Sequence, residues 1–185
     1  MMQGSLMLLK LEHFFDRFSN IMGWIAGFLN LAMLINVFYD AIMRYFFRSG
    51  SIALQEMEWH LFSIVFLFGM AYTLKEDGHV RVDILYDRFN PRWKAIVNIG
   101  GTLLLLMPLS LLIIEGSVWY VHEAYTLNEI SGDPGGLTHR WLIKLVIPAS
   151  FTFLIVSSFG FIVRNISIFR GLEAPPVHHI KDDIL

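Results

Sequence analysis

The chain has 185 residues, of which 55% are hydrophobic and 16% charged, with a mean hydropathy of +0.55 and a net charge of −2. Ordinary soluble domains carry roughly a quarter charged residues, so the composition excludes a typical soluble protein and indicates a membrane protein. There is no cysteine, which excludes disulfides, thiolate metal sites and cysteine nucleophiles.

Residues 1–20 form the first predicted segment. Leu11, Phe14, Phe15, Phe18 and Met22 recur at helical spacing, which predicts an amphipathic helix lying in the membrane interface. Simple continuation into the first span is the alternative. Charges interrupt this segment where a signal peptide would have its apolar core, so we expect it to remain on the mature protein.

Four apolar runs are long enough to cross a hydrocarbon layer of ~30 Å. They cover residues 21–47, 57–75, 95–121 and 142–163. Because lipid cannot satisfy free backbone groups, each run must be helical. The sequence therefore predicts an all-α integral membrane protein with four transmembrane helices. The remaining segments are loops at 76–94 and 122–141 and a tail at 164–185.

The distribution of basic residues predicts the orientation. With four spans, the termini share a side with the second connection, and that side holds ten of the 14 Lys and Arg residues. We therefore expect both termini and segment 76–94 to be cytoplasmic. In a bacterium, loop 122–141 would then be periplasmic.

Asn36, Asp40 and Arg44 lie four residues apart and make one polar stripe in the first span. Polar groups at membrane depth need partners. Arg44 and Glu56 are each six residues from Gly50, so a salt bridge between them is the simplest expectation. Asp40, at i−4 on the same helix, is the competing partner of Arg44, and Glu58 is a third candidate.

Glu115 lies about two turns inside the outer end of the third span, and Lys144 starts the fourth at a similar depth. We expect the two to neutralise each other; a coupling-ion site at Glu115 is a minor alternative. Gly and Ser residues in spans three and four would let helices approach closely.

The histidines raise a different possibility. His60 and His122 are both near outer span ends, as expected for axial ligands of a haem held between helices. A second pair near the inner ends is lacking. Interfacial histidines therefore explain the pattern better than a haem- or quinone-binding anchor of a redox enzyme.

The loops carry no nucleophile-elbow, phosphate-loop, dinucleotide or zinc-protease motif. "SGDPGG" at 131–136 predicts a tight turn, so this loop should be ordered and pack on the outer membrane face. In "EDGHVRVDIL", His79, Arg81 and Asp83 would share one side if extended. We interpret this stretch as an interfacial joint after span two rather than a catalytic cluster.

The order of these features resembles the small membrane subunit (small permease, or Q-type subunit) of tripartite ATP-independent periplasmic (TRAP) transporters. The resemblance rests on "NVFYDAIMRYFF", "QEMEWHLFSIVFLFGMAY", "GHVRVDIL" and "EISGDPGGLTHRWLIKLVIP" in this order. It implies a partnership with a large membrane permease subunit and a periplasmic substrate-binding protein. It also implies uptake of organic acids driven by a cation gradient, usually sodium, without enzymatic activity, a cofactor or nucleic acid.

On this interpretation the chain is a scaffold in membrane lipid that supports the large permease and helps to dock the binding protein. The candidate docking residues are those on the outer loop, namely Glu129, Asp133, His139 and Arg140. An autonomous small carrier is disfavoured, because the spans lack a dense polar lining and paired broken helices.

Overall fold

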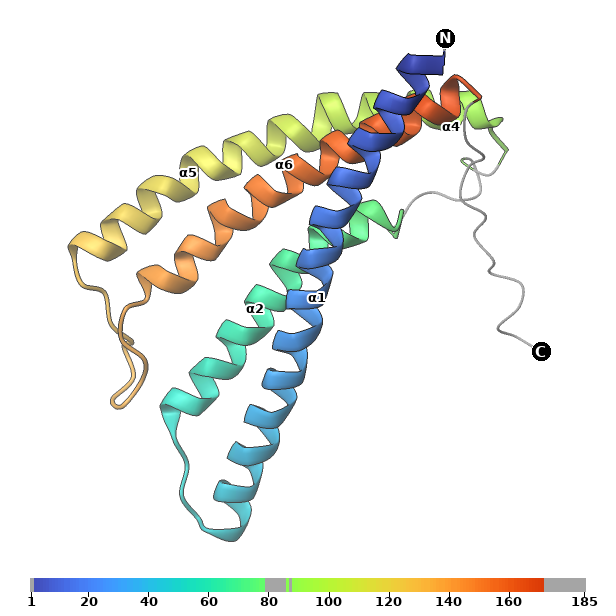
Figure 1. The fold of residues 1–185 in the computed structure, drawn as a ribbon. Coiled ribbons are helices and arrows are strands. Elements are labelled where there is room, and N and C mark those ends of the chain that lie inside the picture. Colours follow the sequence, from blue (N-terminus) through green and yellow to red (C-terminus); the bar gives the residue numbers. More distant parts are fainter. Residues whose placement is uncertain (1, 79–85, 87, 172–185) are drawn as a thin grey trace.

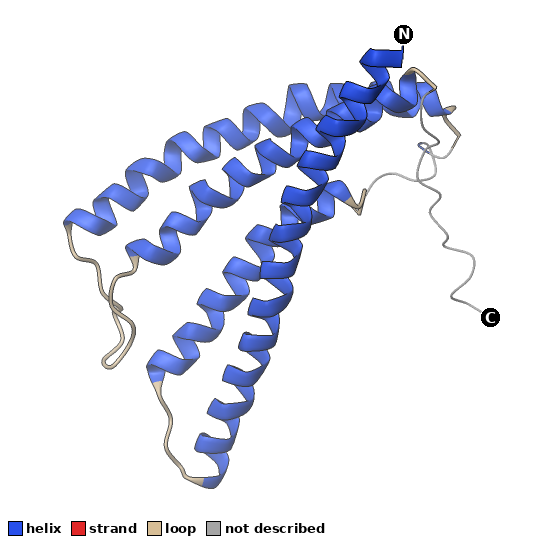
Figure 2. Ribbon diagram, in the orientation of Figure 1, coloured by secondary structure: helices blue, strands red, loops and turns tan. Residues whose placement is uncertain are grey.

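The computed structural model describes residues 2–78, 86 and 88–171. Its helices are α1 (Met2–Phe46), α2 (Ile52–Lys75), α4 (Pro91–Gly101), the π-helical segment η1 (Thr102–Leu106), α5 (Met107–Thr126) and α6 (Trp141–Phe169). The described residues contain no strand (Figure 2). Four helical stretches, with α4, η1 and α5 counted as one, are long and apolar enough to cross a membrane. These observations confirm the predicted all-α fold with four membrane-spanning helices.

The helices form two antiparallel hairpins, α1–α2 and α5–α6, which diverge from each other (Figure 1). At one end, the N-terminal half of α1 crosses α6, and we call this the crossing end. The connections after α1 and α5 lie at the opposite end, which we call the loop end. Helix α6 packs against all three other spans and so holds the hairpins together.

Helix α1 is continuous through the expected boundary between an interfacial segment at 1–20 and a span at 21–47. It has 45 residues, equivalent to about 67 Å at 1.5 Å per residue, which is much longer than a bilayer is thick. The amphipathic residues near its start therefore extend the same helix. Within this helix, Phe15 lies against Phe159 of α6 and Phe18 lies against Phe153 of α6.

The third span begins at a capped helix end and contains one wider, π-helical turn. Asn90 caps α4 by accepting a hydrogen bond from the backbone N–H of Trp93 at 3.0 Å, and Pro91 occupies the first turn. In η1 the backbone N–H of Met107 donates to the carbonyl of Thr102, five residues earlier. Pro108 has no N–H and its ring crowds the carbonyl of Leu104, which explains why the helix is widened here.

The interior consists mainly of small and hydroxylic side chains. Its main apolar cluster consists of Leu74, Leu154 and Phe161. Several buried hydroxyls donate to carbonyls of their own helices, as Ser110 does to Leu106 at 2.7 Å and Ser158 to Leu154 at 2.8 Å. Small side chains permit close helix approach in lipid, and these internal hydrogen bonds satisfy the hydroxyls.

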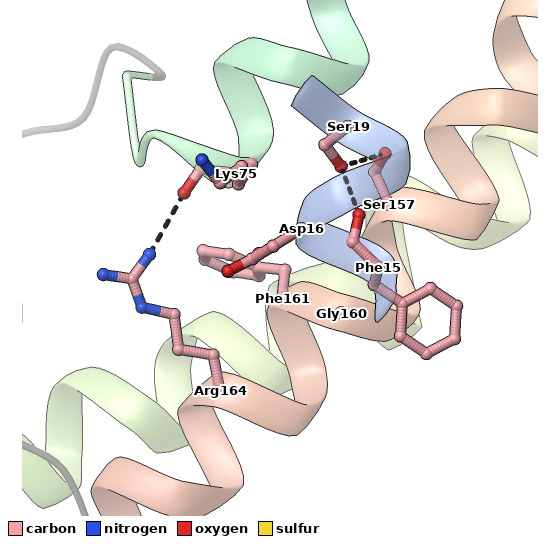
Figure 3. A pocket seen from close by; sticks show the side chains of 8 residues that line it. All are labelled: Phe15, Asp16, Ser19, Lys75, Ser157, Gly160, Phe161 and Arg164. Atoms are coloured by element: carbon pink, nitrogen blue, oxygen red, sulfur yellow. Dashed lines mark hydrogen bonds between the residues drawn. The ribbon is translucent and has the colours of Figure 1, made fainter. Parts of the chain in front are cut away.

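The crossing end brings α1 directly onto α6. Ser19 and Ser157 share a buried hydrogen bond of 2.9 Å, and Ser19 also donates to the carbonyl of Phe15 (Figure 3). Gly160 faces Phe15 so closely that a Cβ added to the glycine would lie 2.5 Å from the Phe15 Cβ. Arg164 donates to the carbonyl of Lys75 at 3.1 Å and so joins α6 to the end of α2. These residues line a small pocket between the three helices.

Candidate functional site

The loop end is organised by the connection at residues 127–140. The carbonyl of Asp133 accepts from the N–H of Gly136 at 3.0 Å across Pro134 and Gly135, and Gly135 has φ +85. Proline at the second position and a positive-φ glycine at the third are typical of a type II turn. The two sides of the loop pair through Ser131 N–H to the carbonyl of Leu137 at 3.0 Å. The predicted tight turn is therefore confirmed.

Glu56 in the first turns of α2 connects this loop to the other hairpin. One carboxylate oxygen accepts from the Ser131 hydroxyl, and the other accepts from the backbone N–H of Leu137 at 2.6 Å. A Cβ at Gly136 would lie 2.8 Å from the same carboxylate, so glycine is needed for the loop to approach. The loop thus bridges the hairpins toward the end at which they diverge (Figure 1). We call this contact the Glu56 clamp.

A second set of contacts fixes the base of the loop to α6. Glu129 forms an ion pair with Lys144, and Arg140 Nε lies 3.8 Å from the same carboxylate. Lys144 Nζ also lies 3.8 Å from the ring centroid of Tyr120 in α5. The Lys144 side chain is only 11% exposed. Since its ammonium has an ionic and an aromatic partner, burial of this charge is compensated.

The expected salt bridge between Arg44 and Glu56 is wrong. Arg44 instead donates to Asp40 at 2.6 Å, which is the competing i, i+4 pair within α1. Similar depth on the two helices of a hairpin does not determine which way a side chain turns. Glu56 turns toward the loop, where a hydroxyl and a backbone N–H compete successfully for its two oxygens.

The expected pair between Glu115 and Lys144 is also wrong. Lys144 points to Glu129, whereas Glu115 lies exposed on α5. Glu115 makes no ion pair or hydrogen bond with the part of the chain that the structure describes. The pairing fails because Glu115 is on a face of α5 that the other described helices leave exposed.

The four proposed docking residues divide into two groups. Asp133 and His139 are exposed on the loop, and His139 Nδ1 lies 2.8 Å from the Thr138 hydroxyl. Glu129 and Arg140 are instead partly occupied in the ion pairs at the base of the loop. Of the four, Asp133 and His139 are therefore the ones without an ion pair among the described residues.

The other polar positions in the first two spans have local roles. Asn36 in α1 donates to the carbonyl of Leu54 in α2 at 2.9 Å and so joins the two helices. Glu58 is half-buried and has no polar partner among the described residues. His60 Nδ1 lies 2.6 Å from the carbonyl of Glu56, and His122 is exposed on α5. No group of three or more His, Asp or Glu side chains suited to a metal ion occurs in the described ranges.

His79, Arg81 and Asp83 lie outside the described residues, so their expected grouping is not addressed by the structure. The described residues just before them end α2 with an ionic contact. Lys75 Nζ donates to Glu76 at 2.8 Å and to the side-chain carbonyl of Asn20 at 2.8 Å. Hydrogen bonding to Lys75 lowers the pKa of the Glu76 carboxyl below its usual value.

Several residues that matter most at the loop end carried little signal in the sequence. Ser131 and the N–H of Leu137 form the clamp with Glu56, yet a loop serine and a backbone group are common features. The available signal was the glycine at 136 beside a predicted turn, since glycine often marks a close backbone approach. The Ser19–Ser157 contact could not be predicted either, because many other small residues in the spans could have formed such a contact.

The comparisons with known proteins agree with this architecture. Residues 33–167 match the family described as "Tripartite ATP-independent periplasmic transporters, DctQ component". A protein of Haemophilus influenzae named "Putative TRAP transporter small permease protein" is 30% identical over 164 residues, covering 86% of this chain and 98% of the relative. A second protein of that name and organism is 24% identical over 131 residues, covering 70% of this chain and 78% of the relative. This chain is therefore a member of the DctQ family, the small permease component of TRAP transporters, and is a multi-pass membrane transport subunit rather than an enzyme.

Proposed function

We propose that this small permease subunit is a scaffold. It supports the large permease subunit of the transporter and presents its loop end to the periplasmic substrate-binding protein. The observation that carries the proposal is the Glu56 clamp, because it holds an exposed turn in one position relative to both hairpins. A loop fixed in this way loses little conformational freedom when a partner binds.

The interior of the chain supports a structural role more than a transport path. Ser110, Ser150 and Ser158 donate to carbonyls of their own helices, so these buried hydroxyls are engaged rather than free to coordinate a substrate. The buried Asp40 accepts from Arg44. A substrate path would need polar groups that exchange partners during transport.

The turn offers chemistry suited to a soluble protein partner. Asp133 and His139 are exposed, and the ion pairs of Glu129 with Lys144 and Arg140 hold the loop base. We propose that the loop end faces the periplasm across the inner membrane, with both termini in the cytoplasm. The excess of Lys and Arg in the termini and second connection supports this orientation.

We also propose that the complete transporter takes up organic acids and is driven by a cation gradient, most simply sodium. This proposal rests on the resemblance to the TRAP family. The small subunit would contribute support and no substrate contact, because the charged groups at its loop end pair with other groups of the same chain. Substrate choice would then belong to the substrate-binding protein and the large permease.

Uptake by the reconstituted three-component transporter tests docking. We expect the double variant Asp133→Arg, His139→Glu to reduce uptake by raising the concentration of binding protein needed for half-maximal transport. Neither side chain contributes to the clamp, so the subunit should fold and assemble normally. Arg92→Glu at the other end of the fold is the matched control, since Arg92 is also exposed.

The outcome separates docking from scaffolding. Unchanged dependence on binding protein in the double variant would exclude the turn as a docking surface. If the wild-type chain does not purify with the large permease at all, the scaffold role itself is wrong. Uptake by the small subunit reconstituted alone would contradict both proposals.

A further inference from the structure

Glu115 is a charged residue in a membrane-spanning helix for which the described residues provide no partner. It lies on α5 eleven residues before the end of the helix at Thr126, which corresponds to about 16 Å along the axis. The residue is exposed, and within the described residues it has neither an ion pair nor a hydrogen bond. Trp119, one turn closer to the loop end, is of the residue type that marks the membrane interface. Glu115 therefore lies inside the apolar layer.

A carboxylate facing lipid at this depth is unfavourable, and such residues usually face protein or a water-filled cavity. The face around Glu115 is not covered by α6, which packs on the buried side of α5 at Ser110, Ser117 and Ala124. Among the described helices, α6 and the adjoining η1 are those that pack closely against α5. No described segment of the chain covers this face, which leaves it available to a partner molecule.

The side chains around Glu115 suit a second helix. Leu112 and Trp119 are 66% and 65% exposed, and they lie on the same face at three and four residues from Glu115. A Cβ added to Gly116 would meet no atom within 4 Å, so this position is an open notch on the helix surface. Notches made by small residues let membrane helices approach closely. His122 continues the face two turns farther on and is also exposed.

The exposed face of α1 provides the contrast. Leu31, Leu34 and Phe38 are exposed there, and they resemble an ordinary lipid-facing surface. Asn30 is the exposed polar residue beside them, and it is uncharged. An amide is much less costly in lipid than a carboxylate, so this face has less need of a protein cover.

We propose that the face of α5 formed by Leu112, Glu115, Gly116 and Trp119 is the surface on which a membrane helix of the large permease packs. The partner helix would present an arginine, lysine or amide donor to the Glu115 carboxylate. This inference rests on the proposed scaffold function and specifies where the partner binds. The charge of Glu115 at membrane depth distinguishes this face from the apolar face of α1.

Site-specific photocrosslinking in the assembled transporter tests the location. The photoreactive residue p-benzoylphenylalanine is introduced in place of Leu112, and in a separate variant in place of Leu34. Both leucines are exposed and lie in the spans, so the second is a matched control. We expect an adduct with the large permease from position 112 and only lipid adducts from position 34. An adduct from position 34 with none from position 112 would overturn the inference.

A second measurement tests the role of the charge. We expect Glu115→Leu to lower the amount of large permease that purifies with the small subunit by roughly tenfold, because the partner's donor loses its acceptor. Glu115→Gln should lose less, since it still accepts a hydrogen bond. The small subunit alone should retain its wild-type Tm in both variants. Full recovery of the complex with Glu115→Leu would overturn the proposed charge contact.

These results are distinguishable from failure of the scaffold proposal. If the wild-type subunits do not purify together, the scaffold function is wrong and this surface has no partner. If they purify together and both measurements at α5 are negative, the scaffold function stands and only the assignment of the face is wrong. If the complex is intact and position 112 forms adducts only with lipid, the scaffold function stands and the assignment of the face is wrong.

Discussion

Glu56 in α2 accepts a hydrogen bond from the backbone N–H of Leu137, a residue 81 positions later in the chain, at 2.6 Å. This contact crosses from the first hairpin to the loop of the second. Together with the bond from Ser131 it determines how the loop lies between the hairpins. The exposed turn at Asp133 is therefore positioned by a residue of the opposite hairpin.

Removal of the Glu56 carboxylate should release the loop. We expect Glu56→Ala to lower the Tm of the purified subunit and to accelerate hydrogen exchange at Leu137, because its N–H loses its acceptor. Hydrogen exchange followed by mass spectrometry measures the second effect directly. Glu58→Ala, two residues away on the same helix and without a polar partner among the described residues, serves as the control. Equal exchange at Leu137 in both variants would contradict the clamp.

The Asp40–Arg44 pair should be strongly non-additive. Arg44→Leu leaves the buried Asp40 carboxylate without its cation, and we expect a loss of about 1–3 kcal/mol. The double variant Asp40→Leu, Arg44→Leu should be more stable than Arg44→Leu alone, since no charge is then left buried. Denaturation of the four proteins of this cycle in the same detergent measures the coupling. Additive losses would show that the two side chains act independently.

Close packing at the crossing end makes Gly160 sensitive to any added side chain. We expect Gly160→Ala to destabilise the subunit by about 1–3 kcal/mol, because its Cβ would overlap the Phe15 side chain. Gly27→Ala is the matched control, since a Cβ there meets nothing within 4 Å. Alanine favours a helix over glycine by about 1 kcal/mol, so the control should be neutral or stabilised. Thermal unfolding of both variants in detergent compares them, and equal Tm values would mean that α1 and α6 are not in contact here.

Glu129, the observed partner of Lys144, and Glu115, the partner expected from the sequence, should differ in their effect on stability. Glu129→Gln removes the ionic partner of Lys144, so we expect a lower Tm for the isolated small subunit. Glu115→Gln should leave that Tm unchanged, because Glu115 has no partner among the described residues. Differential scanning fluorimetry of the two variants is sufficient. A larger loss with Glu115→Gln would restore the pairing of Glu115 with Lys144 that the structure contradicts.

Features of the fold that are determined by residues close together in the sequence could be predicted from the sequence. The four spans were predictable because lipid requires helices in long apolar runs, whatever their neighbours are. The turn at Asp133–Gly136 was predictable because proline and glycine restrict the local backbone. Both features depend on residues close in the sequence.

The pairing of charged residues was less predictable. Arg44 and Glu56 were matched by their depth, but the rotation of each helix and the path of a distant loop decided their partners. Ser131, 75 residues from Glu56 in the chain, gave no indication of its role. The sequence also allowed two forms for residues 1–20, and packing of Phe15 and Ser19 on α6 accompanies the continuous helix.

The widened turn η1 has a consequence for the repeat along the third span. Its buried small residues are Ala95, Thr102, Ser110, Ser117 and Ala124. Successive members are seven residues apart except for one step of eight, from Thr102 to Ser110, which contains η1. A plain α-helix would rotate by about 100° for one extra residue and lose its contact with α6. The π-helical turn accommodates the extra residue without this rotation. The third span therefore keeps a seven-residue repeat with a single one-residue insertion. Deleting one residue between Leu103 and Leu105 would therefore restore an unbroken heptad, whereas a deletion between Ser110 and Ser117 would turn the remainder of α5 away from α6.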